Sequence, residues 1–166
     1  LTECVGDKFL KDLTVLSDLN DVVTDETIDA FNAIKFRKKQ ELCDYIEKHE
    51  GIRLNPNFVF DVQVKRLHEY KRQLLCAMLI AHLQDRLHDD PDMDFVPRAF
   101  VFGAKAAASY KTAKRIIELI CSLSADINAD PVCKGRLQVF FLENYRVSVA
   151  EKLMPAAQVS AQISTA

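Results

Sequence analysis

The pattern of apolar and polar positions changes near residue 58. Before that point, apolar residues recur at the three- and four-residue spacing of a helix, and the TDET stretch offers Thr24 or Asp25 as an N-cap. The FRKK run at 36–39 is interpreted as a solvated helix face. GIRLNPN at 51–57 ends the helix with a glycine and an Asn-Pro turn. We therefore predict a helical lead-in segment over residues 1–57.

After residue 58, short apolar runs alternate with amphipathic stretches. The runs predict strands at 58–64, 98–104, 136–143 and 159–165, and the stretches between them predict helices at 69–90, 109–128 and 148–157. This alternation is typical of a parallel sheet with helices on both faces. The predicted fold class is α/β, with a partial Rossmann-like domain over residues 58–166.

Composition narrows the class of protein further. The chain has 166 residues, 49% of them hydrophobic, and a net charge of -2, which gives no hint of a nucleic-acid or membrane partner. The five cysteines are scattered without a CxxC pair or a spacing that suits zinc, so we predict reduced thiols, a cytoplasmic location and no metal site. The chain opens on Leu1 and stops within a strand-like QISTA, so we expect a piece of a longer protein.

Positive charge is concentrated directly after the first predicted strand. Lys65, Arg66, His68, Lys71 and Arg72 lie within eight positions. Lys71 and Arg72 fall near a helix start, where the helix dipole disfavours each cation by about 0.3–1 kcal/mol. A bound phosphate would reverse that sign, because backbone N–H groups, the dipole and the side chains would all attract it. The placement therefore favours an anion site.

Further polar groups follow the other two predicted strands. Lys105 comes after the second strand, and Tyr145 and Arg146 come after the third. Ligands of open parallel sheets bind outside the carboxyl ends of the strands. If the strands are parallel, these groups and the first cluster emerge at one edge.

A simpler interpretation stays open on the pattern alone. The cluster could be an exposed basic helix start in which Glu69 pairs with Arg72. His49, His82 and His88 have no partner at metal spacing, and surface or core packing is the favoured interpretation for them. No Ser/His/Asp or Cys/His relay can be assembled from the sequence.

Three stretches carry a resemblance to a known family. FDVQVKRLHEYKRQLL at 60–75, FGAKAAASY at 102–110 and FLENYRVSVAEKLMPAAQVSAQISTA at 141–166 resemble the α-glucan phosphorylases, the family of glycogen, starch and maltodextrin phosphorylases. The resemblance implies part of a glycosyltransferase of the GT-B type, in which two Rossmann-like domains of one chain face each other. It also implies that the parent enzyme is a homodimer. It implies phosphorolysis of the terminal α-1,4 bond of a glucan, with release of glucose 1-phosphate and with pyridoxal phosphate as cofactor.

The resemblance also implies roles on the substrate side of such a site. Arg66 and Lys71 match cations that contact the substrate phosphate, and His68 matches a histidine lining the site, so these three are the predicted catalytic residues. Tyr70 matches a residue that meets the sugar. Tyr110 is similar to an aromatic residue at the mouth of the family's active-site channel.

On the cofactor side, Lys65 matches a residue that contacts the cofactor phosphate, and Tyr145 and Arg146 resemble residues beside its ring. In the family, ISTA runs on into a glycine-rich turn and then to the lysine that attaches the cofactor, and this sequence contains neither. We therefore expect this stretch alone not to turn over glucan. The alternative is a non-catalytic anion- or nucleotide-binding module that retains the cationic sheet edge.

Overall fold

The computed structural model describes residues 1–143 and 145–165, in two compact units, Leu1–Arg37 and Lys38–Ala166. The first unit contains the helix α1 (Thr2–Val5), two 3-10 helices (Lys8–Leu10 and Leu13–Asp21) and the first half of α2 (Asp25–Glu50). None of its described side chains is buried. Its order therefore comes from local hydrogen bonds more than from a core.

The predicted boundaries of α2 are confirmed. Thr24 and Thr27 bond reciprocally, each hydroxyl accepting from the other's backbone N–H at 3.3 and 2.7 Å, so Thr24 acts as the N-cap. Gly51 ends the helix with a φ of 68°. The interpretation of the FRKK run was wrong at Lys39, which is only 4% exposed. Its long stem packs in the core while its ammonium donates to the Phe58 carbonyl.

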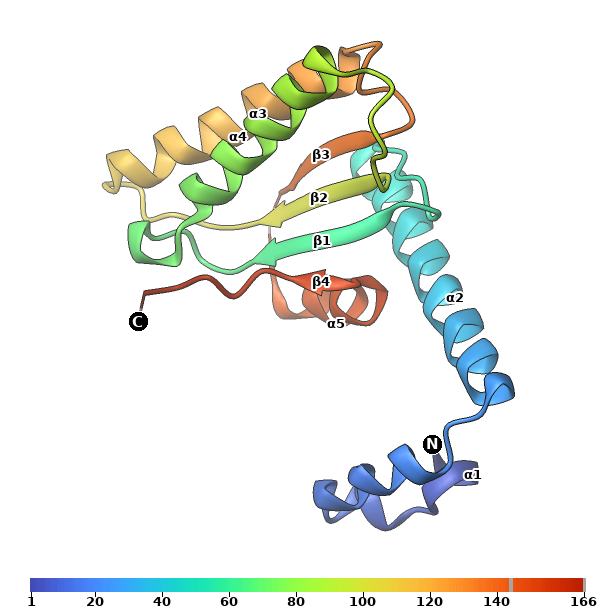
Figure 1. Cartoon of the computed structure of the whole chain (residues 1–166). Coiled ribbons are helices and arrows are strands. Elements are labelled where there is room, and N and C mark those ends of the chain that lie inside the picture. The colour runs from blue at the N-terminus through green and yellow to red at the C-terminus, as the bar shows by residue number, and fades with distance from the viewer. Residues whose placement is uncertain (144, 166) are drawn as a thin grey trace. The chain divides into compact units, whose positions relative to one another are not determined.

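The second unit is built on a four-stranded sheet, which confirms the predicted α/β class. Its strands are β1 (Val59–Val64), β2 (Arg98–Gly103), β3 (Leu137–Leu142) and β4 (Val159–Ser160), in the order β3-β2-β1-β4. All neighbouring pairs are parallel, and β1, β2 and β3 pair over six residues each. These three strands end level with one another (Figure 1). Whatever follows Val64, Gly103 and Leu142 therefore emerges at one edge.

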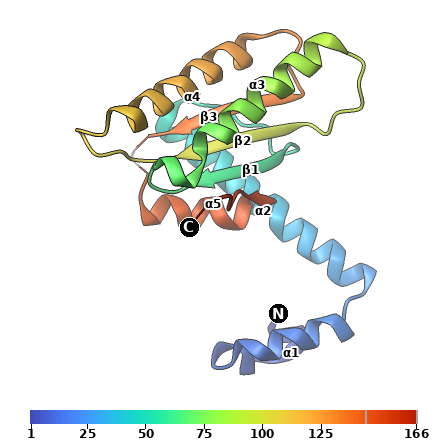
Figure 2. The same ribbon diagram turned by 60° about the vertical axis from the view of Figure 1, so that its left-hand side comes forward.

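Helices cover both faces of this sheet. The helices α3 (Gln73–Asp89) and α4 (Lys111–Ala129) run side by side over one face (Figure 2). The helix α5 (Val147–Ala156) and the C-terminal half of α2 cover the other face. One core cluster centres on Phe100, Phe102 and the α3 and α4 side chains. The other cluster centres on Phe60 and Val62 from β1, with partners from α2 and α5.

Two predicted elements differ in extent. The predicted helix 69–90 is divided into a 3-10 turn (Glu69–Lys71) and α3, because Arg72 between them has a left-handed φ of 59°. The last predicted strand pairs only over Val159–Ser160, since the chain beyond it bonds to the loop after β1. No helix in the described part of the chain is both long and apolar enough to cross a membrane. The domain division at residue 57 stays a prediction.

Candidate functional site

The loop over residues 65–72 follows β1 at the carboxyl edge of the sheet. Its first residues extend the pairing with the neighbouring strand, because the Lys65 N–H donates to the Gly103 carbonyl at 3.0 Å and the Leu67 N–H to the Lys105 carbonyl at 3.1 Å. Leu67 is 4% exposed and belongs to the core beneath α3 and α4. A buried leucine between exposed polar neighbours fixes where the loop lies, and it leaves Arg66 facing solvent.

Hydrogen bonds hold the ammonium groups of two lysines of this loop. The Lys65 ammonium donates to the Gln162 side chain at 2.9 Å, and the Lys71 ammonium donates to the Arg66 carbonyl at 3.0 Å. Burial, and then the charge of Lys71, lowers the pKa of Lys65. Within the described residues, the Arg66 guanidinium makes no hydrogen bond or ion pair. The positive charge of Lys71 thus acts on Lys65, and like charges that act on each other favour a bound anion.

Aromatic side chains lie beside these cations. The ring of His68 is 4.3 Å from that of Tyr70 and 5.5 Å from that of Tyr110, centroid to centroid. The Tyr110 hydroxyl donates to the Glu69 carboxylate at 2.6 Å, and this hydrogen bond raises the pKa of Tyr110. No ion pair joins Glu69 to Arg72 among the residues that the structure describes. The loop therefore differs from the simpler interpretation of the sequence, a basic helix start in which Glu69 pairs with Arg72.

The side chains of Tyr145 and Arg146, which follow β3, lie in different places. The ring of Tyr145 lies against Gly103, where a Cβ would come within 3.3 Å of the Tyr145 Cδ2 atom. Arg146 instead donates from Nε to the Ser148 hydroxyl at 3.1 Å and lines a hollow of about 150 Å³. The other lining residues of that hollow are Tyr45, His49, Glu50, Glu143 and Val149.

No described contact joins Arg146 to Lys65, Arg66 or Lys71. Its backbone is extended (φ -149°, ψ 167°), and successive side chains of an extended chain point in opposite directions. Tyr145 and Arg146 are thus adjacent in sequence but face different surroundings. Lys105 is exposed, and its carbonyl accepts from the loop while its side chain has no described partner there.

Sequence reasoning missed four polar residues that contact the loop. Gln162 accepts from Lys65, and Thr165 donates from its backbone N–H and its hydroxyl to the Tyr70 carbonyl at 3.0 and 3.3 Å. Gln63 and Gln73 are 2% and 1% exposed and bond to loop carbonyls. For Gln63 and Gln73, the sequence did carry a signal, since each glutamine stands at an apolar position of a strand or helix pattern.

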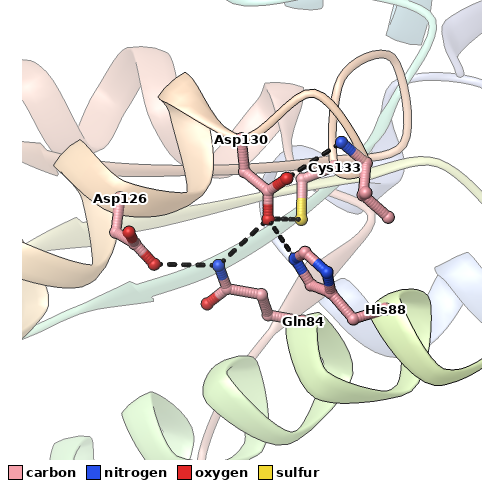
Figure 3. A network of polar contacts seen from close by, with 6 residues as sticks. Gln84, His88, Asp126, Asp130 and Cys133 are labelled. Carbon is pink, nitrogen blue, oxygen red and sulfur yellow. Dashed lines mark hydrogen bonds and ion pairs between the residues drawn. The ribbon is translucent and has the colours of Figure 1, made fainter.

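A second polar cluster joins α3 to the end of α4 (Figure 3). The Asp130 carboxylate accepts from His88 at 2.6 Å, from the Val132 N–H at 2.9 Å, from Gln84 at 3.2 Å and from the Cys133 thiol at 3.4 Å. Cys133 is fully buried, and burial together with the hydrogen bond to Asp130 raises the pKa of its thiol to about 12.

A thiol with that pKa stays protonated near neutral pH and is a poor nucleophile. The cluster therefore serves to hold two helices together, although it contains a cysteine, a histidine and an aspartate. Across residues 1–143 and 145–165, no group of three His, Cys, Asp or Glu side chains is arranged to hold a metal ion.

The fold and the loop together define an open, parallel α/β domain with cations at the carboxyl edge of its sheet, an arrangement typical of proteins that bind phosphate groups. A family model described as carbohydrate phosphorylase matches residues 1–166. The chain belongs to the carbohydrate phosphorylase family.

Curated relatives agree with this assignment. The chain is similar to glycogen phosphorylase of Bacillus subtilis, with 49% identity over 100% of the chain and 21% of the relative. It is also similar to the brain forms of glycogen phosphorylase from Ovis aries and Homo sapiens, each with 47% identity over 100% of the chain and 20% of the relative. The chain thus spans about a fifth of the length of these relatives.

Proposed function

We propose that this chain forms the phosphate-binding edge of a glycogen phosphorylase. Such a glycosyltransferase uses inorganic phosphate to release glucose 1-phosphate from the end of an α-1,4-glucan. The observation that carries the proposal is the loop at the carboxyl edge of the sheet, which holds Lys65, an exposed Arg66 and Lys71, with the charge of Lys71 acting on Lys65. The similarity to glycogen phosphorylases over the whole chain supports it.

On the substrate side, Arg66 and Lys71 would bind the phosphate that attacks the glucan. A guanidinium offers two parallel N–H groups to two phosphate oxygens, which fixes the orientation of the phosphate. The Lys71 ammonium has three N–H donors and uses one on the Arg66 carbonyl, so two remain for a ligand. His68 and Tyr70, which lie against each other, would line the sugar side of the same edge.

On the cofactor side, Lys65 and Tyr145 would bind pyridoxal phosphate. Lys65 is partly buried and the positive charge of Lys71 acts on it, so an anion beside it would be stabilised. The ring of Tyr145, held against Gly103, would face the ring of the cofactor. When bound, the cofactor supplies a phosphate that exchanges a proton with the substrate phosphate. Of the three predicted cofactor-binding residues, Arg146 has the least support, because its guanidinium bonds to the Ser148 hydroxyl.

A site that holds two phosphates side by side needs several cations. Two unit charges about 4 Å apart repel by about 4 kcal/mol at the effective dielectric near a protein surface. Lys65, Arg66 and Lys71 would offset that repulsion and keep both anions in place while the glucan bond breaks. The proposed enzyme is a cytoplasmic homodimer, and the free thiols of all five cysteines fit a reducing compartment.

The test is glucose 1-phosphate release from glycogen and inorganic phosphate by the full-length protein that carries this chain, supplied with pyridoxal phosphate. We expect Lys71→Ala to lower turnover about 100-fold or more, because a positioned charge at the reacting group is lost. The fold, followed by circular dichroism and thermal unfolding, should stay intact. Lys134→Ala, on an exposed turn after α4, is the matched control and should retain full turnover.

Two results would contradict the proposal. Full turnover by Lys71→Ala would remove Lys71 from the substrate site. Binding of phosphate without any release of glucose 1-phosphate by the unsubstituted protein would favour the non-catalytic anion-binding module.

A further inference from the structure

Two buried glutamines lie at the two ends of the loop 65–72. Gln63 is the second-last residue of β1, and Gln73 is the first residue of α3. Their side chains are 2% and 1% exposed. Glutamine is rarely found at such depth, because its amide must replace every hydrogen bond that it made to water.

Both amides bond to the backbone of the loop. The Gln63 Nε2 group donates to the Lys71 carbonyl at 3.2 Å, and the Gln73 Nε2 group donates to the Arg66 carbonyl at 3.3 Å. The Gln73 Oε1 atom also accepts from the His68 N–H at 3.5 Å. Each glutamine therefore reaches across the loop to a residue at its far side.

The two amides and the Lys71 ammonium act on two carbonyl groups of the loop. The Arg66 carbonyl accepts from both Gln73 Nε2 and Lys71 Nζ, and the Lys71 carbonyl accepts from Gln63. The backbone of Arg66 and of Lys71 is thus held from the interior of the protein. The exposed Arg66 side chain and the half-buried Lys71 side chain start from these fixed positions, which is how a loop with a left-handed Arg72 keeps one conformation.

Gln63 also has a feature that destabilises the folded state. Its Oε1 atom is buried and has no hydrogen-bond partner in the described residues. An unpaired buried carbonyl oxygen destabilises the folded state, and methionine would fill the same space without that penalty. A residue that weakens the fold and yet holds a functional loop points to a role in the site.

We propose that Gln63 and Gln73 are positioning residues for phosphate binding. They hold the backbone of Arg66 and Lys71 so that the two cations converge on one anion. The inference rests on the proposed function, because it assumes that these cations bind phosphate.

The experiment measures the dissociation constant for inorganic phosphate by titration calorimetry, and the thermal midpoint without phosphate, in the full-length protein. The variants are Gln63→Met and Gln73→Met. Gln138→Met is the matched control, because Gln138 also has a buried, unpaired Oε1 atom but lies near the start of β3, away from the loop.

We expect Gln63→Met to weaken phosphate binding about 5- to 30-fold, the usual effect of one or two lost positioning hydrogen bonds. Its thermal midpoint should change little, because the unpaired Oε1 oxygen is removed while the Lys71 carbonyl loses the Gln63 donor. A purely structural residue would lose stability instead. Gln73→Met should weaken binding by a similar factor, and Gln138→Met should leave it unchanged.

A double variant tests whether the amides act through the loop cations. In a Lys71→Ala background, Gln63→Met should cause less than a twofold further loss of phosphate affinity. Unchanged phosphate affinity in both glutamine variants, with clear binding by the unsubstituted protein, would overturn the inference and leave the proposed function standing. An unsubstituted protein that binds no phosphate would overturn both.

Discussion

Replacing Asp130 with alanine should destabilise the second unit strongly. The Asp130 side chain is 9% exposed and accepts four hydrogen bonds that join α3, the end of α4 and the turn after it. Alanine would leave the Val132 N–H and the buried Cys133 thiol without an acceptor. His88 is half exposed and Gln84 keeps its bond to Asp126, so these two lose less.

The expected cost follows from these partners. A buried donor without an acceptor costs about 1–3 kcal/mol, and the weaker thiol lies at the low end of that range. The loss for Asp130→Ala should therefore be about 2–4 kcal/mol in the free energy of unfolding. In a chain of this size, that corresponds to a fall in the thermal midpoint of roughly 4–16 °C.

Urea unfolding followed by circular dichroism measures the loss. Asp126→Ala is the control, since this exposed carboxylate accepts one hydrogen bond, from Gln84, and its removal should cost under about 0.5 kcal/mol. An equally small cost for Asp130→Ala would refute the view that this carboxylate holds the two helices together.

The stabilisation that the Asp130 carboxylate provides should also depend on pH. Burial by itself would raise the pKa of the Asp130 carboxyl, but the hydrogen bonds from His88, Val132, Gln84 and Cys133 outweigh burial and hold the pKa well below 3.8. A lowered pKa in the folded state means that the stabilisation is complete above about pH 5 and is lost as pH falls below 3.8. The difference between the unsubstituted protein and Asp130→Ala should shrink in that acidic range.

Two further predictions concern a glycine and the thiols. Gly103→Ala should destabilise the protein by about 1–3 kcal/mol, because the new Cβ would lie 2.5 Å from the Val64 Cγ1 atom and 3.3 Å from the Tyr145 ring. Urea unfolding tests this, and a loss below about 0.5 kcal/mol would count against it. A thiol reagent at neutral pH should modify exposed Cys121 well before buried Cys133, whose pKa is raised to about 12. Mass spectrometry identifies the modified residue, and earlier labelling of Cys133 would show the prediction to be wrong.

The regular part of the fold was predictable from the sequence. The apolar runs at 58–64, 98–104 and 136–143 correspond to β1, β2 and β3 within one residue at each end, because buried parallel strands read as continuous apolar stretches. The cationic edge followed from that alternation, since the carboxyl ends of parallel strands meet at one edge.

The local exceptions were not predictable, because tertiary contacts decide them. The helical pattern runs unbroken through Arg72, and a left-handed arginine has no signal of the kind that glycine provides. Lys39 looks like a surface lysine in a polar run, and its burial depends on tertiary partners that include the Phe58 carbonyl and the Phe60 ring. The different surroundings of Tyr145 and Arg146 depend on an extended residue before α5, which the sequence pattern does not indicate.

The bond from Lys65 to Gln162 has a consequence for biosynthesis. The two residues are 97 positions apart, and a ribosome that adds about 5–20 residues per second needs about 5–20 s to travel that distance. Strand β2 is complete at Gly103 and β3 at Leu142, so all three strands are made before Gln162 is added, while the Lys65 ammonium still lacks its amide partner. The cationic edge is thus completed only after the three strands that support it have been made.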